Sequence, residues 1–150
     1  MSNTADISDI ANWFLSKEAM THKKLQKVCY YAVAWGWALM NKDIAKNDEF
    51  QAWVHGPVSP VLYDTYKGSG WNLINKTKTP SDISADVTDL LESVWLTYGS
   101  KSGNELEALS HSEKPWLEAR AGLSAAERSS EPINPGIMIE FYNSIKSTEY

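Results

Sequence analysis

The sequence is poor in the residues that build redox and metal sites. It contains one cysteine, Cys29, and three histidines, at positions 22, 55 and 111. A single cysteine excludes an internal disulfide and a zinc site made of several cysteines. A glycine-rich phosphate loop, an H-E-x-x-H pair and a G-x-S-x-G turn are also missing. We therefore expect no cofactor, no metal and no catalysis of the kinds that these motifs mark.

Long hydrophobic runs and a surplus of basic residues are missing as well. Residues 1–10 show no basic stretch followed by an apolar run, so no signal peptide is expected. The longest apolar stretch, residues 29–40, is too short and too aromatic to span a membrane. The net charge of −5 disfavours general binding to nucleic acid or to anionic membranes. We expect a cytoplasmic protein with no direct DNA binding; its acidity suits a basic partner, but it also simply keeps a protein soluble.

The residues that are abundant are apolar and aromatic. Hydrophobic residues make up 43% of the sequence, and it contains seven tryptophans and seven tyrosines. Such side chains bury large areas, so 150 residues suffice for a real core. No internal repeat or flexible linker divides the chain. We expect one domain over residues 1–150.

Apolar residues recur at helical spacing along most of the chain, which predicts a mainly α fold: a compact bundle of six to seven helices. Asp6, Thr21 and Ser59 are placed as helix N-caps, and Ser110 stands at capping-box spacing from Glu113. Residues 50–55 and 70–76 leave room for a small β-hairpin. The predicted helices cover about residues 7–17, 22–41, 60–66, 81–98, 102–109, 115–121 and 135–146.

The second predicted helix carries a cluster of aromatic residues that cannot all face one side. Tyr31 and Trp35 are four residues apart and are expected inside the fold. Tyr30 and Trp37 are seven apart, so they share another face. That face is either core or a surface covered by a partner, since tryptophan and tyrosine dominate the contact energy of many interfaces.

A hydrolase that uses Cys29 with His55 and His111, or a metal held by the histidines, is the enzymatic alternative. Cys29 lies on the apolar face of its helix with Leu25, where a free thiol packs as a small hydrophobic group and is inert. No nucleophile lies near His111 in the sequence. Packing is therefore the favoured role of Cys29.

Two short segments combine structural and recognition residues. In residues 53–58, Gly56 and Pro57 form a corner that presents Trp53 and His55 on a rigid loop. In residues 110–116, Trp116 anchors a tight helix connection to the core.

These segments carry a resemblance to a known family. Residues 21–31 (THKKLQKVCYY), 50–58 (FQAWVHGPV) and 106–116 (LEALSHSEKPW) resemble three motifs of the Panacea antitoxin domain, also called SocA-like or phage-associated Gep domains. Tyr63 and Tyr66 fit the helix that follows the second motif. Three separated motifs in the same order over about residues 6–122 make a specific signal.

The resemblance implies a helical antitoxin of phage, prophage and mobile elements that neutralises its toxin by direct contact. The toxin is expected to be encoded by the adjacent gene. An alternative within the family is a proteolytic adaptor or regulator that delivers the toxin to a protease. Some relatives carry an extra DNA-binding domain, for which we see no room outside the matched region. The resemblance brings no catalytic residues and leaves the oligomeric state open.

We divide the candidate site residues into two groups. The expected partner-binding residues are Lys24, Lys27, Tyr30, Trp37, Trp53 and His55. The expected structural residues of the motifs are Leu25, Tyr31, Gly56, Pro57, Ser110, His111, Pro115 and Trp116.

Overall fold

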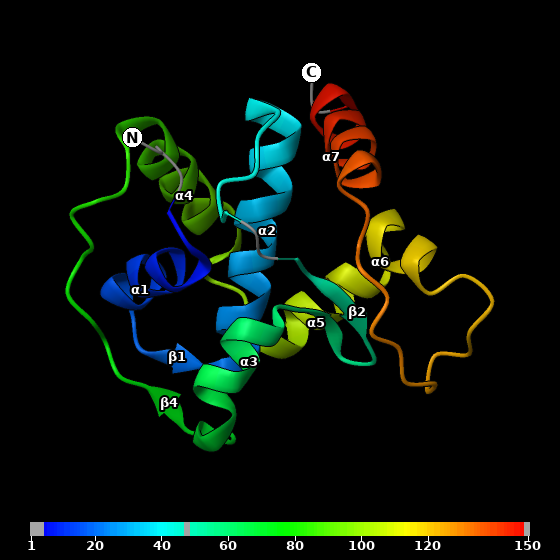
Figure 1. Cartoon of the computed structure of the whole chain (residues 1–150), viewed down its shortest axis with the longest axis horizontal. Coiled ribbons are helices and arrows are strands. Elements are labelled where there is room, and N and C mark those ends of the chain that lie inside the picture. Colours follow the sequence, from blue (N-terminus) through cyan, green and yellow to red (C-terminus); the bar gives the residue numbers. More distant parts are fainter. Residues whose placement is uncertain (1–4, 47–48, 149–150) are drawn as a thin grey trace.

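A computed structural model describes residues 5–46 and 49–148, and it is mainly α, as the periodicity predicts (Figure 1). The helices of this part of the chain are α1 (Ile7–Lys17), α2 (His22–Met40), α3 (Pro60–Tyr66), α4 (Ala85–Tyr98), α5 (Gly103–His111), α6 (Lys114–Ala119) and α7 (Pro135–Thr148), with a 3-10 turn, η1 (Lys67–Ser69). The short strands are β1 (Met20–Thr21), β2 (Gln51–Trp53), β3 (Gly56–Val58) and β4 (Leu73–Ile74).

Helix α2 runs through the middle of the molecule. Figure 1 shows α1 and α4 on one side of it and α5, α6 and α7 on the other. All residues from 25 to 34 are buried, so this stretch meets protein on every side. This burial explains why apolar residues surround the helix there. Its last turns are less enclosed, since Leu39 is 48% exposed.

The ends of the helices follow local capping signals. Asp6 accepts a hydrogen bond from the amide of Asp9, Thr21 from that of Lys24, and Ser59 from that of Leu62. The expected box at Ser110 does not form, because Ser110 lies inside α5 and its hydroxyl donates to the carbonyl of Glu107. Helix α4 begins at Ala85, a few residues later than predicted.

The strands lie where extended structure was expected, but they pair differently. Strands β2 and β3 form a tight antiparallel hairpin, with Gln51 opposite Val58. Strand β4 instead pairs with β1, where Met20 is opposite Ile74. Residues 50–55 and 70–76 are therefore not partners, and each segment completes its backbone hydrogen bonds with another strand.

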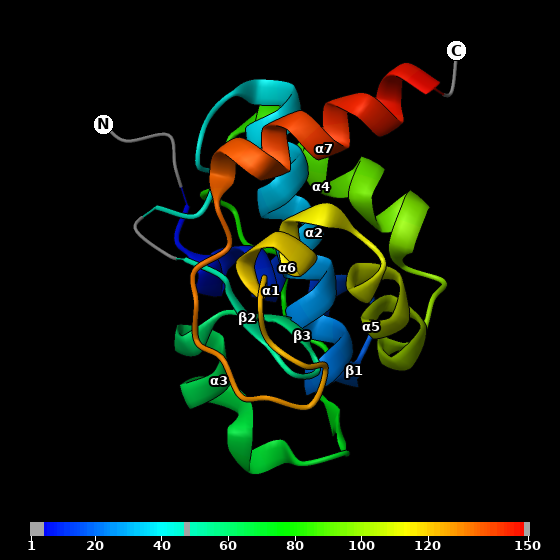
Figure 2. The same ribbon diagram turned by 90° about the vertical axis from the view of Figure 1, so that its right-hand side faces the viewer.

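The segment before α7 closes the other edge of the hairpin. The amide of Ala52 donates to the carbonyl of Glu131 at 2.9 Å, and the amide of Ile133 donates to the carbonyl of Phe50 at 2.8 Å. Figure 2 shows this segment, in orange, running beside β2. The β2 edge of the hairpin is thus held by chain that is distant in sequence.

A buried tyrosine cluster joins α2 to α7. Tyr31 and Tyr142 both donate hydroxyl hydrogen bonds to Glu113 Oε1, at 2.7 and 3.0 Å, and Tyr30 lies 3.1 Å from the Tyr142 hydroxyl. Burial raises the pKa of Glu113, although both hydrogen bonds oppose this. A carboxyl group with two tyrosine donors satisfies the polar atoms that this junction buries.

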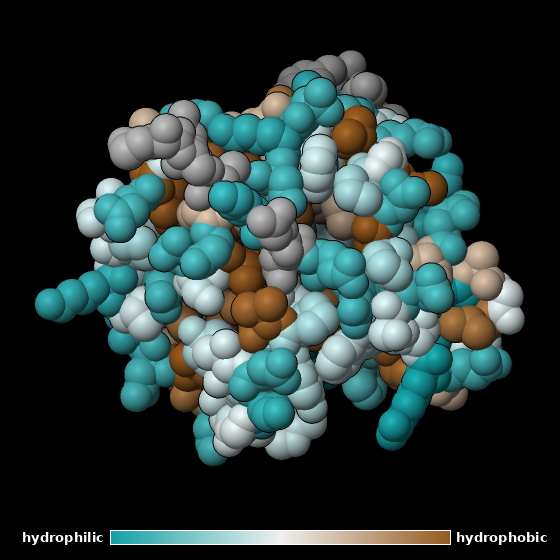
Figure 3. Space-filling view, viewed as in Figure 1, coloured by the Kyte–Doolittle hydropathy of each residue, from teal (hydrophilic) through white to brown (hydrophobic). Residues whose placement is uncertain are grey.

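The surface seen in Figure 3 is mostly hydrophilic, and its hydrophobic residues form small, separate patches. No helix among residues 5–46 and 49–148 is long and apolar enough to cross a membrane.

Candidate functional site

The residues of the enzymatic alternative do not form one site. Cys29 is fully buried within α2, whereas the side chain of His55 is 72% exposed at the hairpin turn. Within the described part of the chain, no three His, Cys, Asp or Glu side chains are arranged to hold a metal ion. The ring of His111 stacks on Trp116 at 4.0 Å, and burial lowers the pKa of His111.

Two hollows lie against the β2–β3 hairpin, and together they form what we call the hairpin groove. Its first half has a volume of about 340 Å³ and is lined by His22, Lys23, Gln26, Lys27, Trp53, His55, Val58, Tyr63, Gly70 and Trp71. Its second half has a volume of about 700 Å³ and is lined by Trp53, Val54, His55, Val58, Tyr63, Ala126, Arg128, Ser129 and Ser130. The two halves share Trp53, His55, Val58 and Tyr63 in their lining, so they adjoin at the hairpin.

Aromatic side chains form the rim of the groove. The rings of Trp53 and Tyr63 lie 4.9 Å apart, and the ring of His22 lies 5.8 Å from Tyr63. Trp71, just after η1, is 79% exposed, and the ammonium of Lys23 lies 5.3 Å from its ring. A large aromatic ring left this exposed on a folded protein is a typical feature of a contact surface.

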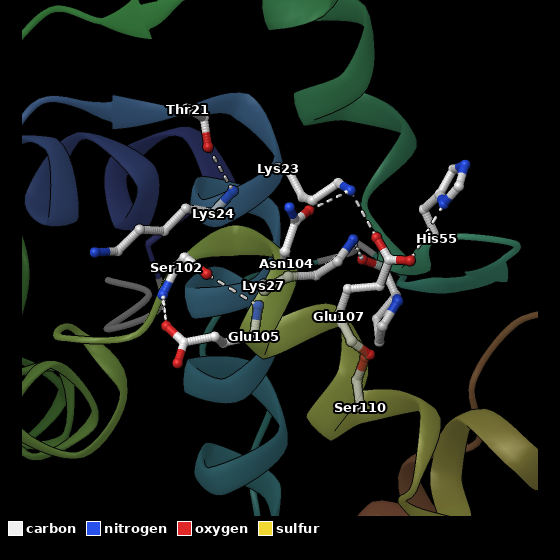
Figure 4. A network of polar contacts seen from close by, with 11 residues as sticks. Thr21, Lys23, Lys24, Lys27, His55, Ser102, Asn104, Glu105, Glu107 and Ser110 are labelled. Atoms are coloured by element: carbon white, nitrogen blue, oxygen red, sulfur yellow. Dashed lines mark hydrogen bonds and ion pairs between the residues drawn. The ribbon is translucent and has the colours of Figure 1, made fainter. Parts of the chain in front are cut away.

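A polar network ties α2, α5 and the hairpin turn together (Figure 4). Glu107 lies between Lys23, whose Nζ is 2.7 Å from Oε1, and His55, whose Nδ1 is 3.3 Å from Oε2. Burial raises the pKa of Glu107, but the hydrogen bonds and charges of Lys23 and His55 outweigh it and keep that pKa below its ordinary value. The network fixes where the turn stands relative to α2.

Lys27 lies beneath the hairpin and is only 2% exposed. Its ammonium donates to the carbonyl of Pro57 at 3.1 Å. Burial lowers the pKa of Lys27 to about 7. Gly56 has φ of +106°, and a Cβ there would lie 2.8 Å from Lys27 Cε and 3.1 Å from Ser110 Oγ. The turn therefore needs glycine both for its backbone conformation and for the space that Lys27 and Ser110 occupy.

Two further side chains hold the walls of the groove. The side-chain amide of Gln26 accepts a hydrogen bond from the backbone N–H of Ser59 at 2.8 Å and donates one to the backbone carbonyl of Ser59 at 3.2 Å. It thus pairs with Ser59 as a neighbouring strand would. Arg120, which is 4% exposed, donates to the carbonyls of Ala52 and Ser124, both at 3.0 Å. The floor of the first half and the loop of the second half are thus fixed by buried hydrogen bonds.

The structure separates the six expected partner-binding residues. Trp53 and His55 lie in the groove. Lys24 points the opposite way from Lys23 (Figure 4), where its ammonium reaches Glu18 and the carbonyl of Gly99. Trp37 is partly buried near the far end of α2.

Tyr30 and Lys27, two of the expected partner-binding residues, are buried within this chain, and for Tyr30 the structure favours the core alternative. Tyr30 is 1% exposed, because α7 covers its face of α2. The hydroxyl groups of Tyr30 and Tyr142 form a hydrogen bond there. Lys27 is covered by the hairpin, to which it donates. Helical periodicity cannot reveal either contact, since both partners come from distant segments.

The expected structural residues are placed as follows. Leu25 and Tyr31 are fully buried, and Ser110 is 1% exposed. Pro115 occupies the first turn of α6, and the indole of Trp116 donates to the carbonyl of Trp53 at 2.9 Å. The third motif therefore packs against the second one, beneath the groove.

Several residues that line or support the groove were not among the candidates: Gln26, Tyr63, Trp71 and Arg128 in its lining, and Glu107 and Arg120 behind it. Trp71 carried a usable signal, because a tryptophan in a polar, loop-like segment has no periodic partner and is more easily explained by contact than by core packing.

Comparison with known proteins gives two matches. Residues 25–117 match the family described as Antitoxin SocA-like, Panacea domain. A curated relative, Antitoxin SocA of Caulobacter vibrioides (strain NA1000 / CB15N), is 32% identical over 132 aligned residues, which cover 75% of this chain and 69% of that protein. No solved structure matches.

Proposed function

The chain belongs to the SocA-like, Panacea-domain family of antitoxins, and on that premise we propose that it neutralises a cognate toxin by binding it directly at the hairpin groove. The toxin is a protein that the adjacent gene encodes. The chain itself makes and breaks no covalent bond in this process. Its role is to cover the surface that the toxin needs.

The observation that supports this proposal is the rigid aromatic rim. Trp71 is 79% exposed and Tyr63 is 39% exposed, beside a hairpin that buried hydrogen bonds hold along its β2 edge. Aromatic rings on a fixed backbone contribute large contact areas without a large loss of conformational entropy. This combination is what a tight protein interface requires at its centre.

The required affinity can be compared with what such residues supply. Nanomolar binding corresponds to about 12 kcal/mol. Single aromatic residues at the centre of interfaces contribute about 2 kcal/mol or more when they are truncated to alanine. A few groove residues can therefore account for a large share of the affinity, provided that they are all buried by the toxin.

Co-expression tests this proposal. The adjacent gene is expressed from an inducible promoter, and growth is compared with and without this chain. We expect growth to stop with the neighbour alone and to resume with the wild-type chain. Trp71→Ala should weaken the binding by about tenfold or more and lower the rescue. Leu96→Ala is the matched control, because Leu96 is 83% exposed on α4, away from the groove.

Two results contradict the proposal. One is a neighbouring product that is harmless when expressed alone. The other is a Trp71→Ala variant that accumulates to the wild-type level and protects as well as Leu96→Ala does. Toxin abundance, followed by immunoblot, separates masking from delivery to a protease: masking leaves it unchanged, whereas delivery lowers it unless the protease is inactivated.

A further inference from the structure

The hairpin groove differs in charge from the rest of the molecule. The chain has 19 acidic and 14 basic residues, yet neither half of the groove is lined by an aspartate or a glutamate. Its lining instead includes Lys23, Lys27 and Arg128. An acidic protein thus has a groove whose charged lining residues are all cations.

Not all of this charge is available to a partner. Glu107 stands behind the lining and forms an ion pair with Lys23 at 2.7 Å. The surplus therefore resides on Lys27 at the floor and on Arg128 in the second half. Arg128 is exposed, so a partner can reach its side chain.

Lys27 is the more informative of the two. Its ammonium has the carbonyl of Pro57 as a partner, and no carboxylate of the described residues forms an ion pair with it. Glu107 acts on it only from a distance, since that carboxylate is already engaged by Lys23 and His55. The charged form of a buried lysine is costly, and a further negative charge nearby stabilises it. The floor of the groove thus favours an anionic group above it.

The rim adds a second requirement. Trp53, Tyr63 and Trp71 offer apolar faces immediately beside these cations. A ligand that satisfies both features carries carboxylates and large apolar side chains in close succession. An acidic, aromatic stretch of polypeptide has this chemistry.

We propose that the hairpin groove receives an acidic segment of the toxin, with carboxylates directed toward Lys27 and Arg128 and apolar side chains packed on the aromatic rim. This inference rests on the proposed function and specifies the partner's chemistry. Nucleic acid fits less well, because every nucleotide adds a phosphate and the strand beyond the groove would meet the repulsion of a protein with a net charge of −5. A short peptide segment can confine its few carboxylates to the groove.

Substitution of one exposed residue by a charged one tests the sign of the partner's charge. Ser130 is exposed at the second half of the groove, beyond the hairpin. Binding of the purified product of the adjacent gene is measured by titration calorimetry at low and high salt. Ser130→Lys should lower the Kd by about two- to fivefold at low salt and Ser130→Glu should raise it, with both effects shrinking at high salt. The same substitutions at Ser93, exposed on α4, are the matched controls and should leave the Kd unchanged.

Removal of the Lys27 charge tests whether the floor of the groove contributes to binding. Lys27→Met keeps most of the apolar stem and removes the ammonium. We expect it to fold and to bind the same toxin about tenfold more weakly. A Kd for Lys27→Met equal to the wild-type value, together with equal values for the two Ser130 variants, overturns the inference while the proposed function stands.

Failure of the proposed function gives a different pattern. A neighbouring product that does not bind the wild-type chain defeats both proposals. If a fluorescein-labelled single-stranded oligothymidylate binds and Ser130→Lys tightens it while the toxin affinity does not change, the groove is a nucleic-acid site and the inference is wrong. The inference is supported if Ser130→Lys and Ser130→Glu shift the Kd for the toxin in opposite directions and the Ser93 variants leave it unchanged.

Discussion

At the scale of single residues, Lys27 is a case in which the expected role in binding conflicts with the stability of the fold. Its carbon stem packs below Gly56, but its ammonium lies in a place where a charge is unfavourable. Burial lowers the pKa of Lys27 from 10.5 to about 7. Between these values the unfolded chain holds a proton that the folded chain does not, so stability rises with pH through this window.

The rise of stability with pH gives the first prediction. Urea unfolding of the wild-type chain should show about 2 kcal/mol more stability at pH 9 than at pH 7 from Lys27 alone. Lys27→Met should lack this increase and should be the more stable protein at pH 7. Identical pH dependence in the two proteins would show that Lys27 keeps its proton in the folded state.

Gly56 supports a second prediction at the same scale. Gly56→Ala places a side chain at φ of +106° and within 2.8 Å of Lys27 Cε. A non-glycine residue in such a conformation costs about 1–3 kcal/mol. Urea unfolding should show a loss of at least that size, and toxin affinity should fall as the hairpin shifts.

Gly68→Ala is the control for this substitution. Nothing lies within 4 Å of a Cβ at Gly68, and its φ is not in the left-handed region. We expect it to be neutral or slightly stabilising. Equal losses at both positions would contradict the account of the turn.

Residue-level expectations succeeded where the cause was local. The N-caps Asp6, Thr21 and Ser59 are readable because each needs only the three residues that follow. The burial of Lys27 and Tyr30 depends on residues that follow far along the chain, Pro57 and Tyr142. No spacing within α2 carries that information.

At the scale of elements, helices were easier to predict than strand partners. Helical periodicity located α1, α3 and α7 because it repeats within each segment. Strand pairing depends on which edge is near, and β2 pairs with both β3 and residues 131–133. The groove consists of such pairings, so its position could not be derived from the sequence, although Trp53 and His55 in its lining could be proposed.

The junction of α2, α6 and α7 gives a third prediction. Burial raises the pKa of Glu113, so the folded state favours its protonated form. That contribution is fully present below the unfolded pKa and is lost as the pH rises through the folded pKa. Glu113→Gln can still accept from Tyr31 and Tyr142 but does not titrate, so it should exceed the wild type in stability at pH 7 and match it at low pH.

Glu105→Gln is the matched control for this element. Hydrogen bonds from Ser102 lower the pKa of Glu105, so the sign is reversed. Its replacement should cost stability near neutral pH and nothing at low pH. Thermal unfolding at several pH values measures both variants. A gain for Glu105→Gln, or a loss for Glu113→Gln at pH 7, contradicts these assignments.

At the scale of the whole molecule, the sum of charges and their placement lead to opposite expectations. A net charge of −5 suits a basic partner. The groove, however, has no acid in its lining and favours an acidic segment. Composition adds the charges without locating them, so only the fold reveals that the acidic surplus lies elsewhere.

Hydrogen exchange of this chain, with and without the purified product of the adjacent gene, locates the surface that the toxin covers. We expect binding to slow exchange of the backbone amides in the hairpin and around Trp71. The exposed surface of α4 should exchange at the same rate in both samples. Protection confined to α4 or α7, with the hairpin unchanged, would contradict the claim that this antitoxin holds its toxin at the groove.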